Sequence, residues 1–189
     1  MTTVKPFRQS DAAWRWWNNL RPTQNSPGDR AALARLRRCS SPLEAAMEPA
    51  TIDLFRALGF HSPENNLERV AVLAVALAGV REQPKPNIKL ARALGPSSDK
   101  VDDAKLKPLR FRRLLGARGA EETLVAFRRA VQLLGGVANV GDLAELILAW
   151  NEEGVGDRVR VRFAFDYHNA GAYAPPPANF EVLHEEIVQ

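Results

Sequence analysis

The sequence has few of the features on which secreted and membrane proteins depend. Only one of its 189 residues is a cysteine, Cys39, so the chain cannot form an internal disulfide, as is usual in a reducing compartment. Its longest apolar run, residues 70–78, is far shorter than the ~20 residues needed to cross a bilayer. The first residues lack the apolar core of a signal peptide. We therefore expect a cytoplasmic protein with no membrane contact.

Candidate catalytic and metal-binding residues are also few. The sequence contains no HExxH, CxxC, P-loop or GxSxG pattern, and its histidines lie far apart, at His61, His168 and His184. The acid pairs at 102–103 and 152–153 fall in predicted loops, where a solvated surface is the more common role. Asp166 and His168 are two residues apart on a predicted helix, so they point away from each other. We expect no enzymatic activity, no cofactor and no metal.

Positive charge is in mild excess and is unevenly distributed. The net charge is +4, with a pI of about 9.6. The last sixteen residues contain three Glu and no Lys or Arg, so the rest of the chain is more basic than the total suggests. A basic body of this kind favours a nucleic acid or another polyanion as partner.

Apolar spacing predicts an all-α protein. Helical periodicity or continuous apolar composition marks residues 11–20, 49–58, 67–78, 88–94 and 142–150. Residues 67–78 are apolar nearly all round, which indicates a buried central helix. Residues 155–167 fit a strand or a helix, but no second strand pattern exists to pair with them, so we favour a helix. Three tryptophans of the first helix, Trp14, Trp16 and Trp17, could stack on bases, although core positions are more common for them.

A polar segment without periodicity, residues 97–105, divides the chain. We expect two small helical-bundle domains, residues 1–96 and 106–172, joined by this linker. Residues 173–189, with three consecutive prolines, are expected to form an extended tail.

The densest basic stretch is residues 106–134, with seven Lys or Arg against two Glu. On a helix over residues 120–134, the apolar side chains share one face, and Arg128 and Arg129 lie on the opposite arc with no carboxylate three or four residues away. Just upstream, Arg110, Arg112 and Arg113 belong to a shorter helix that Gly116 is expected to end. Helices with one apolar face and unpaired arginines on the opposite face indicate phosphate-binding surfaces.

A second arginine-rich helix is predicted after residue 26. Its apolar face is Ala32, Leu33 and Leu36, and the rest of its surface carries Arg30, Arg37, Arg38 and, less cleanly, Arg35. Ser26 is the expected N-cap, as Ser10 is for the first helix, with Asp29 also near the helix start. Phosphate binding and a merely solvated polar face are both compatible with these arginines, and we favour phosphate binding.

Seven segments in this order resemble the CasB family, the small subunit of the type I-E CRISPR surveillance complex Cascade. They are GDRAALARLRR (28–38), LERVAVLAVALAG (67–79), LARALG (90–95), LRFRRLL (109–115), FRRAVQLL (127–134), NVGDLAELILAW (139–150) and FAFDYH (163–168). The chain departs from the family pattern at His168, where family members often carry a second tyrosine, and the residues after Tyr173 lie outside the resemblance.

The resemblance implies a non-catalytic, all-helical, two-domain subunit of an antiviral defence complex, present there in two copies. Its partners would be the other Cascade subunits, the guide RNA, the target DNA and the displaced DNA strand, which basic residues help to hold without reading sequence. Carried over by motif, the expected nucleic-acid contacts are Arg30, Arg37, Arg38, Arg92, Arg110, Arg113, Arg128 and Arg129. Lys89 joins them because it lies three residues from Arg92 on one helix face.

Two other kinds of protein fit less well. A helical adaptor could use the same arginines to dock on an acidic protein partner. A helix-turn-helix regulator would need a short helix pair with polar recognition residues suited to base edges, which the sequence lacks.

Overall fold

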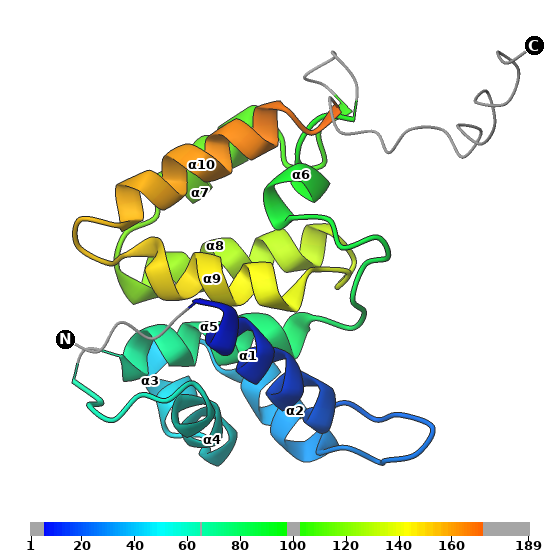
Figure 1. Ribbon diagram of the computed structural model, residues 1–189, viewed down its shortest axis with the longest axis vertical. Helices are drawn as coiled ribbons and strands as arrows, with labels where there is room; N and C mark the ends of the chain where they lie inside the picture. Colours follow the sequence, from blue (N-terminus) through cyan, green and yellow to red (C-terminus); the bar gives the residue numbers. More distant parts are fainter. Residues whose placement is uncertain (1–5, 65, 98–102, 172–189) are drawn as a thin grey trace, which may run out of the picture.

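A computed structural model describes residues 6–64, 66–97 and 103–171 of the chain (Figure 1). These residues form helices joined by loops, with two isolated β-bridges and no β-strand among them. The prediction of an all-α fold is confirmed. None of the helices in the described ranges is both long and apolar enough to span a membrane.

The helices follow one another with short connections. In chain order they are α1 (Pro6–Leu20), α2 (Arg30–Arg38), α3 (Pro42–Ala46), α4 (Pro49–Ala57), α5 (Leu67–Gly79), α6 (Leu90–Leu94), α7 (Pro108–Gly116), α8 (Gly119–Leu133), α9 (Val140–Trp150) and α10 (Gly156–His168). Residues 155–167 are therefore helical, as favoured from the absence of a partner strand. The short helix α3 was not predicted.

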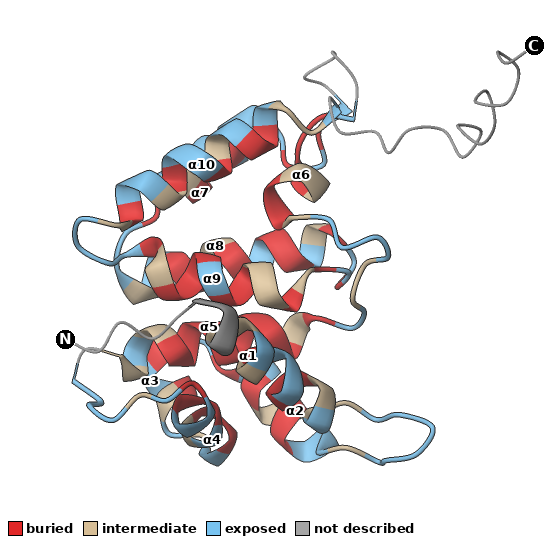
Figure 2. Cartoon of the chain, in the orientation of Figure 1, coloured by how far each residue is buried: buried red, intermediate tan, exposed pale blue. Residues whose placement is uncertain are grey.

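Helix α5 is the centre of the fold. Its residues 70–78 are all buried, as Figure 2 shows in red. A helix that is apolar on every side must be covered on every side, and α2, α3, α4, α8 and α9 pack against it. Its alternating Ala and Val or Leu side chains let these neighbours approach closely. The prediction of a buried central helix is confirmed.

The remaining helices extend this core. Helix α9 lies against α1, α5 and α10, α6 packs on α10, and α7 packs beside α8. Buried apolar side chains from all of these helices form one continuous cluster. It includes Trp16 and Trp17 of α1, whereas Trp14 is 45% exposed. The division into two domains stays a prediction, and part of the predicted linker and the predicted extended tail lie outside the described residues.

Two predicted helix starts are wrong. Helix α1 begins at Pro6, so Ser10 is an interior residue whose hydroxyl donates to Glu145. Helix α2 is capped by Asp29, whose carboxylate accepts from the Ala32 backbone N–H at 2.8 Å. Ser26 belongs instead to a turn closed by a backbone hydrogen bond between Thr23 and Ser26. The chain therefore enters α2 three residues later than predicted.

Candidate nucleic-acid interface

Helices α7 and α8 form a hairpin whose apolar sides are buried. Pro108 begins α7, where its missing N–H costs nothing, and Phe111 packs its ring 3.8 Å from the ring of Tyr167 on α10. On α8, Phe127 lies edge-on to Trp150 of α9, with ring centroids 5.0 Å apart. Because these aromatic contacts fix the inner sides of both helices, the arginines on the outer arcs are held toward the surface.

A groove of about 1060 Å³ runs between α7 and α8. Arg110 and Arg113 of α7 line it together with Arg129 of α8, and all three are exposed. None of them makes a hydrogen bond or ion pair with another residue in the described ranges. The other lining residues are Leu106, Leu114, Gly116, Ala117, Glu121, Glu122, Val125, Ala126, Gln132 and Leu133. The structure thus brings three of the predicted site residues together in one groove, which Glu121 and Glu122 also line.

Arg128 has a different environment from Arg129. It is half-buried, and its guanidinium donates a hydrogen bond to the backbone carbonyl of Cys39, the C-cap of α2. Carbonyls at the end of a helix have no partner within that helix and carry partial negative charge, so a guanidinium is well placed there. Arg128 therefore joins α8 to the end of α2.

The arginines of α2 also divide into two groups. Arg30 and Arg38 are exposed and make no hydrogen bond or ion pair with any residue that the structure describes. Arg37 donates from Nε to the carbonyl of Ala78, at the end of α5, at 2.7 Å. Arg35 donates from Nε to Glu48 at 2.7 Å, which accounts for its poor fit to the basic face. Only the first two have guanidinium groups fully available to a ligand.

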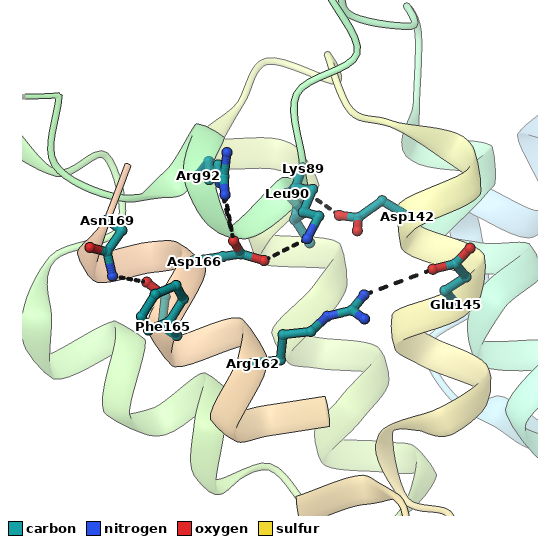
Figure 3. A network of polar contacts seen from close by, with 9 residues as sticks. All are labelled: Lys89, Leu90, Arg92, Asp142, Glu145, Arg162, Phe165, Asp166 and Asn169. Carbon is teal, nitrogen blue, oxygen red and sulfur yellow. Dashed lines mark hydrogen bonds and ion pairs between the residues drawn. The ribbon is translucent and has the colours of Figure 1, made fainter. Parts of the chain in front are cut away.

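Lys89 and Arg92 converge on Asp166 of α10 (Figure 3). Lys89 Nζ lies 2.9 Å from one carboxylate oxygen, and Arg92 donates to the other from Nε at 3.1 Å and Nη2 at 3.0 Å. Asp166 is buried, which by itself would raise its pKa, but the hydrogen bonds from Lys89 and Arg92 outweigh burial and hold the pKa below its ordinary value. Both predicted site residues thus form an ionic link between α6 and α10.

A second carboxylate holds the start of the same short helix. Asp142 of α9 accepts a hydrogen bond from the Leu90 backbone N–H at 2.7 Å. Burial raises the pKa of Asp142 to about 6, although the Leu90 N–H and the nearby charge of Lys89 act in the opposite direction. Glu145 and Arg162 lie one helical turn from Asp142 and Asp166 (Figure 3). Arg162 Nη2 is 4.0 Å from Glu145 Oε2. Helix α6 is thereby attached to both α9 and α10.

Sequence reasoning missed the structural roles of Asp142 and Asp166. Both are acids within helices rich in apolar residues, and Asp166 stands between Phe165 and Tyr167. A carboxylate in a buried position has to be paired or hydrogen-bonded, so the apolar surroundings were a usable signal. What the sequence did not contain was the identity of the partners.

The groove provides cations and hydrogen-bond donors. Guanidinium groups bind phosphates by charge and by paired N–H donors. In the described part of the chain, no three His, Cys, Asp or Glu side chains gather into a group that could hold a metal ion.

Comparison with known proteins gives one family. The family described as CRISPR-associated protein Cse2 matches residues 32–168. The match includes α3 to α10 and nearly all of α2. No curated protein and no solved structure matches the chain. Because the family match extends over well more than half of the sequence, the chain belongs to the CRISPR-associated Cse2 family, the CasB small subunit of type I-E Cascade.

Proposed function

We propose that this Cascade small subunit is non-catalytic and binds the backbones of the guide RNA and target DNA, stabilising the displaced DNA strand through arginine-rich helix faces. Sequence would be read by base pairing elsewhere in the complex, so the protein needs only affinity for phosphates. A second copy of the chain beside the first would extend the arginine-rich surface along the nucleic acid. Because exchange of a DNA duplex for an RNA–DNA duplex is nearly balanced in free energy, modest binding of the displaced strand favours the open state.

The observation that carries this proposal is the groove between α7 and α8. Arg110, Arg113 and Arg129 come from two helices and converge on one hollow, and no carboxylate of the described residues forms an ion pair with any of them. Guanidinium groups from two helices that line one hollow can bind phosphates together, by charge and by paired N–H donors. A strand laid along the groove would bring its phosphates to all three.

The nine predicted contact residues therefore differ in their availability. Arg30, Arg38, Arg110, Arg113 and Arg129 have unpartnered guanidinium groups among the described residues. Arg37 and Arg128 each donate to a backbone carbonyl, and Lys89 and Arg92 bind Asp166. We expect the first five to dominate binding and the other four to contribute less, since their charges already have partners within the fold.

The test is binding of fluorescently labelled single-stranded and duplex DNA across a salt series. For Arg110→Ala combined with Arg129→Ala, affinity should fall and the slope of log affinity against log salt should become shallower by roughly 0.7 per lost phosphate contact on single strands. The matched control is Arg15→Ala with Arg56→Ala, which removes the same charge from exposed positions on α1 and α4. The control should change the slope little. Equal effects of the two double variants would mean that net charge, not the groove, drives binding.

A protein-docking function has one observation in its favour. Leu43 and Met47, four residues apart at α3, are 72% and 77% exposed. Exposed apolar pairs on one helix face favour contact with another protein. If these two side chains dock on another subunit, Leu43→Ser with Met47→Ser should weaken assembly and leave DNA affinity unchanged. The adaptor alternative, in which the arginines themselves dock on an acidic protein, predicts that Arg110→Ala with Arg129→Ala weakens assembly more than it weakens DNA binding.

A further inference from the structure

The α8 wall of the groove carries a negative charge near the α7–α8 turn and a positive charge two turns further along. Glu121, Val125 and Arg129 follow one another at intervals of four residues on α8, so they form one line along the groove wall. Glu121 lies near the α7–α8 turn, and Arg129 lies two turns further along. At ~1.5 Å per residue the two positions are about 12 Å apart along the helix axis.

The carboxylate of Glu121 is available to a ligand. Its neighbour Glu122 also lines the groove but accepts a hydrogen bond from the Arg118 backbone N–H at 2.9 Å, at the start of α8. Glu121 is exposed and makes no hydrogen bond or ion pair with any other described residue. Of the two acids, Glu121 is therefore the one whose oxygens face the groove without a partner.

Between Glu122 and Arg129, the α8 residues that line the groove are apolar, Val125 and Ala126. Val125 is 39% exposed, and Leu114 of α7 lines the same hollow. A phosphate backbone alone has no use for such a surface, nor for a carboxylate beside it. A ligand that matches all three parts has an anionic end, a flat apolar body and an edge of N–H donors.

A single nucleotide of an unpaired strand has this form. Resting on the proposed nucleic-acid function, we propose that the groove holds one nucleotide, with its phosphate at Arg110 and Arg129, its base over Val125 and the polar edge of the base at Glu121. A base in a duplex cannot enter, because its polar edge is already paired. The groove would thus select unpaired strand over duplex.

The carboxylate also determines which base fits best. An ionised glutamate only accepts hydrogen bonds. Guanine presents two adjacent N–H donors on its pairing edge, and cytosine and adenine each present an amino group, which glutamate can accept. Thymine and uracil present one N–H between two carbonyl oxygens, which the carboxylate repels. Binding should therefore favour guanine and disfavour thymine at this one nucleotide, in addition to sequence-independent contacts with the backbone.

The experiment compares two labelled single strands of equal length at one low salt concentration, one of thymidine only and one with isolated guanosines at every fifth position. The full-length protein should bind the guanosine-containing strand about fivefold more tightly, the lower range for a good side-chain–base pair. Glu121→Gln, which can also donate to a thymine carbonyl, should bring the ratio close to one. The matched control is Glu153→Gln, at an exposed position after α9, and it should keep the wild-type ratio.

The outcomes separate this inference from the function on which it rests. Equal binding of the two strands by the wild-type protein, or an unchanged ratio in Glu121→Gln, would overturn base recognition and leave backbone binding intact. Loss of the preference in Glu153→Gln as well would mean that general charge, and not Glu121, sets it. Absence of binding to either strand at low salt would instead overturn the proposed nucleic-acid function.

Discussion

Arg128 and Arg129 are consecutive on α8, yet only Arg128 is bound within the fold. Its guanidinium donates to the Cys39 carbonyl at the end of α2, whereas Arg129 lines the α7–α8 groove and has no partner in the described ranges. Successive residues on a helix point about 100° apart, so one side chain reaches the neighbouring helix and the other reaches the hollow. Two residues that look equivalent in sequence therefore have separate roles.

This difference predicts opposite effects of two single substitutions. Arg128→Ala removes a hydrogen bond from a charged donor and should lower the free energy of unfolding by about 1–2 kcal/mol, with little change in DNA affinity. Arg129→Ala should leave stability within about 0.5 kcal/mol and weaken binding, because an exposed side chain without partners contributes little to the fold. Urea unfolding and the DNA-binding salt series measure the two quantities. The same effect of both substitutions on binding would contradict the division.

Much of the fold could be predicted because its signals are local. The apolar residues of α5 predicted its central, buried position. Residues 155–167 fitted a strand or a helix, and the absence of a second strand pattern favoured the helix that became α10. Helix boundaries were less accurate. A serine–proline pair such as Ser26–Pro27 is typical of a helix start, but Ser26 closes a tight turn with Thr23, and the helix begins after Asp29.

The site could be predicted only in part, because ion pairs between distant residues have no local signature. Lys89 and Arg92 carry the same spacing pattern as the free arginines, yet their partner Asp166 lies 77 and 74 residues further along the chain. The periodicity of α7 and α8 indicated which arginines face outward. It could not show that Arg110 and Arg129 come to one groove, since that depends on how the hairpin closes.

Asp166 is expected to be the most important carboxylate for stability. Asp166→Asn leaves Lys89 and Arg92 facing a neutral amide that cannot accept all of their hydrogen bonds. Because Lys89 and Arg92 remain partly exposed to water, we expect a loss of about 2 kcal/mol, less than for a fully buried pair. Chemical denaturation at neutral pH measures the loss in the free energy of unfolding. The control is Asp53→Asn, on the exposed face of α4. A loss within 0.5 kcal/mol, about that of a surface position, would mean that the pair adds little.

Asp142 should make stability depend on pH in the direction opposite to Asp166. The folded-state pKa of Asp142 is about 6, above the ~3.9 of an unfolded aspartate, so between these values the folded protein holds a proton that the unfolded chain releases. The contribution of Asp142 to the free energy of unfolding is therefore most favourable below pH 4, and it is lost as the pH rises through 6. Asp166 has a lowered folded-state pKa, so it stabilises the folded protein at pH values above its unfolded-state pKa. This stabilisation is lost as the pH falls through the folded-state pKa.

Asp142→Asn isolates the first effect. The amide oxygen can still accept from the Leu90 N–H but does not titrate, and Asp166 is common to both proteins and cancels in the comparison. The free energy of unfolding of the variant, relative to the wild type, should rise between pH 4 and pH 7 by up to about 3 kcal/mol, the equivalent of two pKa units. Urea unfolding at intervals over this range gives the curve. A difference that is flat with pH would mean that Asp142 titrates normally in the folded protein.

Gly95 is expected to be irreplaceable for steric reasons. It ends α6 with φ −74°, a conformation open to any residue, but a Cβ at this position would overlap the carbonyl oxygen of Tyr167 and lie 2.8 Å from the Cβ of Ala170. Gly95→Ala must therefore push α6 away from the end of α10, which should cost about 1–3 kcal/mol as overpacking. Gly116→Ala, at the end of α7, is the matched control because nothing lies within 4 Å of its added Cβ, and it should be neutral or slightly stabilising. The melting temperatures of the two variants, from thermal unfolding, test this prediction. Equal melting temperatures would mean that α6 can move without cost. The attachment of α6 to α10 through Asp166 would then also be weaker than the contacts indicate.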